Sequence, residues 1–291
     1  MHFIQAKSLL SPKNGMNVYR GCTHGCIYCD SRSSVYQMNH AFEDVAVKEN
    51  APELLEAALS RKRKRCMIGF GSMSDPYIPL ERELKMTRKC LGIISQYRFG
   101  VSLITKSDLI LRDIDLITEI NEKAKAVVSI TLTTADDVLC KKIEPHVCTA
   151  SRRAEVLCAL HDAGIATVVW LCPFLPFIND TEENMMSLLK ICRDTHVHGV
   201  LCFGTGLTLR EGNREYLYEQ FEKDFPGMKE RYQETFGDSY ECASAGSARL
   251  MNLVQTFCRE NGILSDTNEV FTYMNSLDGD KKDTQMKLCG Y

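Results

Sequence analysis

Short apolar segments alternate with helical segments along most of the chain, and this alternation constrains the fold more than any other feature of the 291 residues. Six segments read as strands, at 15–20, 66–71, 100–105, 126–132, 165–172 and 199–203. Helices are predicted around them at 52–62, 80–97, 109–123, 152–163 and 181–194, with a short helical piece from Ala135. Apolar strands joined by helical crossovers predict a parallel sheet that is covered by helices and curved into a barrel-like arc, an α/β fold.

The chain is expected to form one large domain with a tail. Residues 1–13 read as an irregular lead-in, 14–206 hold the strand–helix units, and 31–47 predict a hairpin or loose loop. Residues 207–291 leave this rhythm, with helices predicted at 214–225, 228–236 and 247–260 and a loose charged stretch after Asp278. We expect these helices to pack on the barrel as a C-terminal extension, and the protein to be a monomer.

The composition is that of an ordinary globular protein, with 44% hydrophobic residues, 25% charged residues and a net charge of −3. This charge creates no global field that would favour nucleic acid or an anionic membrane. No run of about 18 apolar residues occurs, and the start of the chain is too polar for a secretory signal. We therefore expect a cytoplasmic protein.

Fourteen cysteines are scattered rather than paired, which argues against a disulfide framework in a reducing compartment. Such cysteine usage is easiest to tolerate where oxygen is scarce, and we expect an anaerobic lifestyle. Seven of the cysteines sit in apolar periodic stretches and are interpreted as small buried hydrophobes: Cys66, Cys90, Cys158, Cys172, Cys192, Cys202 and Cys258.

Three further cysteines, Cys22, Cys26 and Cys29, follow the spacing C-x3-C-x2-C, with Tyr28 before the last. A [4Fe–4S] cluster normally takes four cysteines, so a loop with three leaves one iron open to a small molecule. The alternatives are a structural zinc site and three unrelated buried thiols. A closed zinc site needs a fourth ligand, but no second C-x2-C or H-x3-H pair occurs, and His24 has little room to close the tetrahedron.

The spacing and the aromatic residue resemble the signature of the radical S-adenosylmethionine (SAM) superfamily, and the run from Asn17 through Asp30 is similar to its spore photoproduct lyase-like branch. The resemblance spans about residues 14–260 and implies a partial (β/α)6 barrel, a [4Fe–4S] cluster, and SAM chelated at the open iron. It also implies an electron donor such as flavodoxin or ferredoxin, and cleavage of SAM to a 5′-deoxyadenosyl radical that abstracts hydrogen. The alternative is a non-catalytic iron–sulfur sensor of redox state or oxygen, which polar residues at the other strand ends disfavour.

Those polar residues are the site candidates, because strand ends and βα loops form the active-site edge of a barrel. Asp75 can accept hydrogen bonds from amines or ribose hydroxyls, or can belong to a turn before Pro79. Lys106 is suited to hold a carboxylate at the barrel mouth. The resemblance places Ser74 on the amino group of SAM and Lys106 on its carboxylate, and it makes Tyr28 a cofactor-binding residue.

The later strand ends extend this set of candidates. Ser129, Thr131 and Thr133 share one face because they are spaced by two, and the resemblance places Ser129 near SAM. The two threonine hydroxyls can equally be capped by the backbone. Arg153 is interpreted as a structural or a SAM-side cation. The Pro-rich exit at 173–180 resembles the superfamily segment that lines the adenine.

Ser72 is the most informative departure from the lyase-like pattern. Lyases that repair spore photoproduct are expected to have a hydrogen-donating cysteine at this strand end, and a serine O–H bond is too strong to replace it. A DNA photoproduct lyase therefore remains only an alternative, and the substrate stays open between nucleic acid, peptide and small molecule. We predict Tyr240 or Cys242 as the hydrogen donor, against the alternative that Cys242 is an incidental thiol.

A basic run occupies residues 61–65, Arg-Lys-Arg-Lys-Arg. It is compatible with binding to DNA or RNA. It is equally compatible with the solvated end of the helix predicted before it.

Overall fold

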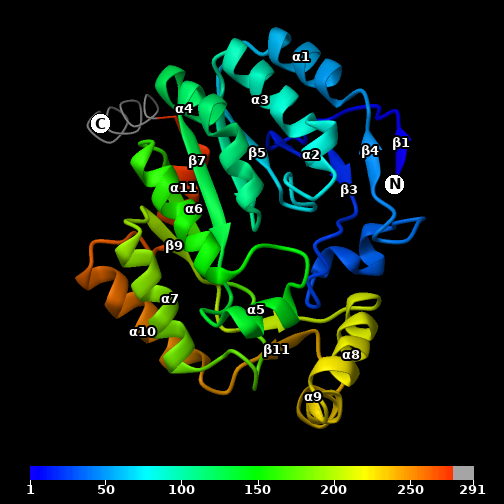
Figure 1. Cartoon of the computed structure of the whole chain (residues 1–291), viewed down its shortest axis with the longest axis vertical. Helices are drawn as coiled ribbons and strands as arrows, with labels where there is room; N and C mark the ends of the chain where they lie inside the picture. Colours follow the sequence, from blue (N-terminus) through cyan, green and yellow to red (C-terminus); the bar gives the residue numbers. More distant parts are fainter. Residues whose placement is uncertain (278–291) are drawn as a thin grey trace, which may run out of the picture.

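A six-stranded parallel sheet forms the centre of the protein (Figure 1), seen in a computed structural model that describes residues 1–277. Because β2 and β9 stand at opposite ends of the strand order, the sheet is an open arc rather than a closed ring. This confirms the partial α/β barrel predicted from the alternation of strands and helices. The strands follow in chain order: β2 (Gly15–Met16), β5 (Met67–Phe70), β6 (Gly100–Thr105), β7 (Ala126–Thr131), β8 (Ala166–Trp170) and β9 (Gly199–Leu201).

The outer face of the sheet is covered by helices, as Figure 1 shows. Alternate strand residues, among them Ile68, Val101 and Val128, share one buried core with the apolar stripes of these helices. Each fully buried Leu or Ile contributes roughly 1.5–3 kcal/mol, so this core holds the arc together. The covering helices are α1 (Ala51–Arg61), α3 (Met86–Gln96), α4 (Ile114–Lys123), α6 (Ala150–Asp162) and α7 (Glu182–Asp194).

The inner face is partly filled by a helix that the sequence pattern did not indicate, α11 (Thr267–Asn275). Its Val270 and Met274 form a buried cluster with inward residues of four strands: Met67, Val127, Val168 and Leu201. These residues stand at or near the amino ends of β5, β7 and β8 and at the end of the short β9. The helix therefore packs on the inner face of the sheet, and its Phe271 contacts Trp170 at the carboxyl end of β8, with ring centroids 6.0 Å apart.

The segments around the cysteine loop are more ordered than predicted. The predicted strand 15–20 is two strands in two sheets, because the chain leaves the barrel after β2 and re-pairs as β3 (Tyr19–Arg20). β3 pairs antiparallel with β4 (Ala46–Lys48), which pairs in parallel with β1 (His2–Ile4). The predicted lead-in 1–13 and the loop 31–47 therefore each contribute to a second, three-stranded sheet.

Two predicted helices are interrupted. The helix predicted at 80–97 breaks at Lys85, whose φ of 52° is left-handed, into α2 (Glu81–Leu84) and α3. The break turns Glu81 inward, where its fully buried carboxylate accepts from the Thr87 amide at 3.0 Å and pairs with Arg112 at 2.7 Å. The helix predicted at 109–123 starts as the 3-10 turn Asp108–Asp113 and becomes α4 only from Ile114.

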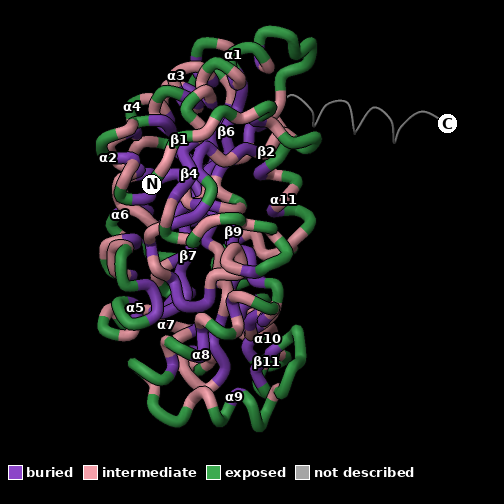
Figure 2. Tube along the Cα trace, turned by 90° about the vertical axis from the view of Figure 1, so that its right-hand side faces the viewer, coloured by how far each residue is buried: buried purple, intermediate pink, exposed green. Residues whose placement is uncertain are grey.

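The C-terminal extension contains the three predicted helices, now α8 (Asn213–Asp224), α9 (Met228–Phe236) and α10 (Ser247–Glu260). A strand pair that was not predicted joins the segment before α8 to the segment after α9, with β10 (Gly206–Thr208) running antiparallel to β11 (Glu241–Ala243). Helix α10 packs against α7 of the barrel. Helices α8 and α9 share a buried cluster with the cysteine loop through residues that include Tyr28, Phe221 and Tyr232. Figure 2 shows buried segments continuing from the sheet into this part of the chain.

The burial of three cysteines differs from the prediction. Cys158 is exposed and Cys66 and Cys172 are half-buried, so these three are not the core residues that their apolar surroundings suggested.

Among the helices of residues 1–277, none has the length and apolar character needed to cross a membrane. The basic run 61–65 follows α1 and leads into the start of β5, so it lies at the sheet edge opposite the strand ends that carry the site. The stretch after Asp278 lies outside the described residues.

Substitution of Phe221 tests whether the extension stabilises the barrel. Its ring is fully buried against Tyr232 with ring centroids 4.9 Å apart, so Phe221→Ala should lower the free energy of unfolding by about 3–5 kcal/mol. Urea denaturation followed by circular dichroism measures this loss. The control Phe3→Ala removes an exposed ring and should cost less than about 0.5 kcal/mol. Equal stability of the two variants would show that this packing is unimportant.

Candidate functional site

The three cysteines of the loop line one cavity of about 320 Å³ at the carboxyl edge of the sheet. The same cavity is lined by residues at the ends of β5, β6, β7 and β8, among them Asp75, Lys106, Thr131 and Trp170. Because parallel strands end at one edge, residues that are far apart in the sequence converge there. The strand ends that the sequence singled out therefore meet the cysteine loop in space.

The spread of the three thiols distinguishes a cluster from a zinc ion. Three thiolates on one tetrahedral zinc stand about 3.8 Å apart. In the described residues, Cys22, Cys26 and Cys29 do not form a set whose donor atoms all lie within 4.8 Å of one another. A [4Fe–4S] cluster takes each cysteine on a different iron and so needs the wider spacing. The three thiols therefore do not stand in the compact arrangement of a single zinc site.

Burial of the thiols also fits a metal centre. Cys22 and Cys26 are 9% and 8% exposed, and burial raises the pKa of Cys22 to about 12 and the pKa of Cys26 well above its usual range. A thiol in this setting ionises only when a cation takes over from water. A cationic metal centre would supply that charge, and binding would release protons.

Ser74 and Asp75 hold the cysteine loop and the strand ends together. The Ser74 hydroxyl donates to the Gly21 carbonyl at 2.6 Å, next to the first cysteine. Asp75 accepts from the Thr105 hydroxyl at 2.7 Å and from the Lys106 amide at 2.9 Å, so it ties β5 to β6. It also accepts from the Tyr77 amide at 2.8 Å, which is the turn interaction weighed for it above. Both residues line the cavity, but their groups already serve the protein itself.

Lys106 differs from Ser74 and Asp75, because its ammonium group forms no ion pair with the described residues. Within residues 1–277 it pairs with no carboxylate, and its Nζ lies 5.8 Å from the centre of the Tyr28 ring. Burial lowers the pKa of Lys106, but the neighbouring Cys26, Glu144 and Asp75 outweigh burial and raise it. The side chain is therefore a protonated cation that lines a cavity and is available to an anionic ligand group.

A buried ion pair lies behind the cysteine loop. Arg153 and Glu144 are 1% and 0% exposed, with Nη2 and Oε2 2.6 Å apart. The Tyr28 hydroxyl donates to Glu144, and Arg153 also donates to the Thr131 carbonyl at 3.0 Å. Arg153 does not line the cavity, so its contacts favour the structural reading of this residue over the SAM-side reading.

Two inward groups near the cavity have no partner among the described residues. Ser129 is fully buried on the inner face of β7, one step deeper than Thr131, and its hydroxyl makes no hydrogen bond. The indole N–H of Trp170, a residue that lines the cavity, is likewise unpaired. A buried polar group without a hydrogen-bond partner costs free energy. A bound molecule that accepts a hydrogen bond from the Trp170 N–H would remove this cost for one of the two groups. Thr133 reaches Glu144 at 3.4 Å.

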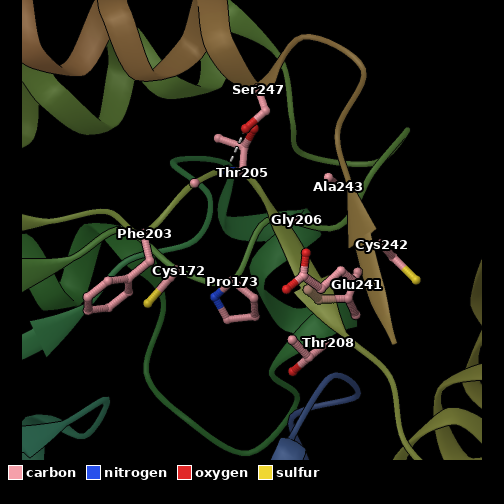
Figure 3. A pocket seen from close by; sticks show the side chains of 12 residues that line it. Cys172, Pro173, Phe203, Thr205, Gly206, Thr208, Glu241, Cys242, Ala243 and Ser247 are labelled. Carbon is pink, nitrogen blue, oxygen red and sulfur yellow. Dashed lines mark hydrogen bonds between the residues drawn. The ribbon is translucent and has the colours of Figure 1, made fainter. Parts of the chain in front are cut away.

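The two predicted hydrogen donors do not line the cysteine cavity in the described chain. Tyr240 is 44% exposed, and its hydroxyl accepts from Arg210 at 2.6 Å. Cys242 is fully buried in the cluster beneath α8. Figure 3 shows its side chain pointing away from a neighbouring pocket, on the face of β11 opposite to Glu241 and Ala243.

Comparison with known proteins gives the family. The Radical SAM superfamily model matches residues 16–189, which is more than half of the chain and includes the cysteine loop. The chain belongs to the Radical SAM superfamily. This agrees with the resemblance carried by the cysteine spacing.

Individual relatives of this Radical SAM protein add the fold but no substrate. It is 33% identical over 187 residues to an uncharacterized protein of Methanocaldococcus jannaschii, covering 62% of this chain and 69% of that protein. It is 28% identical over 232 residues to an uncharacterized protein of Mycobacterium tuberculosis, covering 76% and 66% respectively. A mutant of spore photoproduct lyase superposes with a TM-score of 0.67 and 12% identity over 90% of this chain and 80% of that one.

A second spore photoproduct lyase mutant, with bound AdoMet and dinucleoside spore photoproduct, gives a TM-score of 0.63 and 10% identity. That comparison covers 91% of this chain and 80% of the other. Identities this low show a common fold of this Radical SAM protein and spore photoproduct lyase.

Sequence reasoning missed the structural importance of Glu144 and the positions of Trp170 and Cys172. Nothing local in the sequence signals that Glu144 pairs with Arg153 below the loop. Trp170 and Cys172 have the same parity as Val168 along β8. Their inward orientation was therefore predictable once the inner face was known.

Replacing Arg153 tests the buried pair. Arg153→Met leaves Glu144 buried without its cation and should lower the free energy of unfolding by about 3–5 kcal/mol. The neighbouring Arg152 makes exposed pairs with Glu155 and Asp108, so Arg152→Met should cost less than about 1 kcal/mol. Chemical denaturation of the cluster-free protein measures both. A loss in Arg153→Met no larger than in Arg152→Met would contradict this account.

Proposed function

We propose that this protein is a radical SAM enzyme that reductively cleaves SAM and uses the resulting radical to abstract hydrogen from an organic substrate. The observation that carries the proposal is the convergence of three cysteines, of which Cys22 and Cys26 are buried, and the unpaired ammonium of Lys106 on one cavity. The thiols suit a [4Fe–4S] cluster with one open iron, and Lys106 suits the carboxylate of an amino acid beside it. Membership of the Radical SAM superfamily supports the same chemistry.

Cys22, Cys26 and Cys29 would hold the cluster. When bound, the cluster supplies the electron that cleaves the sulfonium of SAM into methionine and a 5′-deoxyadenosyl radical. Lys106 holds the carboxylate of SAM, and Trp170 offers its unpaired N–H to a cofactor oxygen or nitrogen. Ser74, Asp75 and Tyr28 keep the loop and the strand ends in place, and Ser129 adds a hydroxyl below the cavity.

The bound cofactor would thereby supply a radical that abstracts hydrogen from a C–H bond of the substrate, with 5′-deoxyadenosine as the co-product. An external one-electron donor, such as flavodoxin or ferredoxin, restores the reduced state before each cleavage. The final hydrogen donor stays a prediction, with Tyr240 and Cys242 as candidates that a closing movement would have to bring toward the cavity.

Two alternatives have less support. A sensor needs only the cysteine loop, whereas here the cationic side chain of Lys106 also lines the cavity, as does Trp170, whose buried indole N–H has no partner among the described residues. Photoproduct repair is disfavoured because Ser72, at the strand end where a lyase is expected to carry a cysteine, lines the cavity as a serine.

Anaerobic reconstitution tests the cluster. The wild-type chain should bind about four irons and four sulfides, and the Cys22→Ala/Cys26→Ala/Cys29→Ala variant should bind essentially none. Cys158→Ala is the control, because this exposed cysteine is far from the loop in sequence and should leave the iron content unchanged. Iron and sulfide analysis decides the matter, and a full cluster in the triple variant would refute the assignment.

Lys106 is tested by SAM binding to the reconstituted protein. Loss of a charge-assisted contact worth about 1.5–3 kcal/mol should weaken binding of SAM about 10- to 150-fold in Lys106→Ala. Equilibrium dialysis with labelled SAM measures the change, and Lys62→Ala, on the opposite edge of the sheet, should bind like wild type. Unchanged binding by Lys106→Ala would remove Lys106 from the cofactor site.

A further inference from the structure

A second cavity, of about 430 Å³, adjoins the cofactor cavity. Cys172 and Pro173, which follow β8, line both, so a molecule in the second cavity reaches the first across these two residues. The other walls come from the segment after β9 and from the β10–β11 pair (Figure 3). Its volume lies within the range of small-molecule sites.

The second cavity carries a negative charge, whereas a site that binds nucleic acid carries positive charges. Of the described residues that line it, Glu241 is the only charged one. Figure 3 shows its carboxylate directed toward Pro173, the boundary with the cofactor cavity. Within the described chain no cation pairs with this carboxylate. A free carboxylate in a cavity attracts a cation and repels phosphate.

An aromatic wall lies beside Cys172, as Figure 3 shows. Phe203 is 53% exposed, and its ring is stacked on Phe271 with centroids 5.9 Å apart and an interplanar angle of 23°. A ring that is held from behind and open in front offers a flat apolar surface to a ligand. It also favours a cation through its π face.

Binding of a nucleic acid backbone needs lysines or arginines that neutralise phosphates. The cavity has none among its described lining residues, and the basic run 61–65 lies at the opposite edge of the sheet. The features that are present suit a different ligand.

We infer that the substrate carries a protonated amino or guanidino group, which Glu241 binds while the apolar part of the substrate packs on Phe203. This inference rests on the proposed radical chemistry and adds the substrate class. The bound group places a neighbouring C–H bond at the Cys172–Pro173 boundary, within reach of the cofactor cavity. The same cationic group occurs in free amines and in lysyl or arginyl side chains of peptides.

Binding is tested without turnover, on reconstituted protein that holds its oxidised cluster and SAM but no reductant. The free-amine probes are agmatine and cadaverine, and the peptide probes are acetyl-Ala-Lys-Ala-amide and acetyl-Ala-Arg-Ala-amide. The anionic comparators are acetyl-Ala-Glu-Ala-amide and a thymidine hexanucleotide. Isothermal titration calorimetry should show binding of at least one cationic probe and weaker binding of both comparators, and the better-bound arm identifies the source.

Variants then locate the site. Glu241→Gln should weaken binding of the cationic probe at least about tenfold, and Glu241→Lys should reverse the preference toward the acidic peptide. Glu234→Gln, an exposed carboxylate of α9 that does not line the cavity, is the matched control and should bind like wild type. Iron content and circular dichroism confirm that each variant is folded and loaded.

The inference is overturned by any of three results. These are tighter binding of the acidic peptide or the hexanucleotide by wild type, unchanged binding of cations by Glu241→Gln, and no binding of any cationic probe up to its solubility limit. Formation of 5′-deoxyadenosine with dithionite and no substrate is measured separately. Its absence together with intact cation binding would refute the radical chemistry and leave the binding site in place.

Discussion

The buried pair of Glu144 and Arg153 is the interaction on which the site depends most directly. It joins the end of β7 and helix α6 to the cysteine loop through the Tyr28 hydroxyl, so the loop rests on two charges that are almost wholly removed from water. Removing ions from water is costly, and apolar residues of the same shape often stabilise a fold more. Apolar residues could not replace the pair here, because the Glu144 carboxylate accepts a hydrogen bond from Tyr28. This hydrogen bond fixes the orientation of Tyr28 and thereby the end of the loop.

The first cysteine is held from the other side by the turn at Phe42, which precedes β4. Gly21 has a φ of +93°, and a side chain there would collide with the Phe42 carbonyl oxygen, which also accepts from the Cys22 amide at 3.1 Å. Only glycine adopts this backbone conformation without strain while leaving room for the neighbouring chain. The loop is thus clamped between the 31–47 segment, the ends of β5 and β6, and helices α8 and α9. A rigid clamp keeps three ligands in place before any metal arrives.

The predictions succeeded where local pattern decides the outcome and failed where distant residues decide it. Six apolar strands, their helices and the cysteine spacing are local signals, and the parallel arc follows from them. The break at Lys85 is not local, because it arises from the demand of the buried Glu81 carboxylate for the Thr87 amide and Arg112. Helix α11 was not predicted for a similar reason. Its Val270 and Met274 are core residues only because they pack against the inner face of the sheet, which is formed by distant parts of the chain. The β10–β11 pair joins segments more than thirty residues apart and carries no short-range hairpin signal.

The same distinction separates what is known of the chemistry from what is known of the substrate. The residues proposed for the cofactor come from the strand ends of the barrel and from one short loop, so a motif and a fold point to them together. The second cavity is assembled from Cys172 and Pro173 of the barrel and from Glu241 on β11 in the extension, and no local motif links these positions. Of its outer wall, Leu207 and Cys242 belong to the buried cluster of the cysteine loop, whereas Glu241 is exposed and lies outside that cluster. If Glu241 binds the substrate as inferred above, its carboxylate would select the charge of whatever approaches the cofactor site, and the extension would then be the part of the chain that defines the substrate.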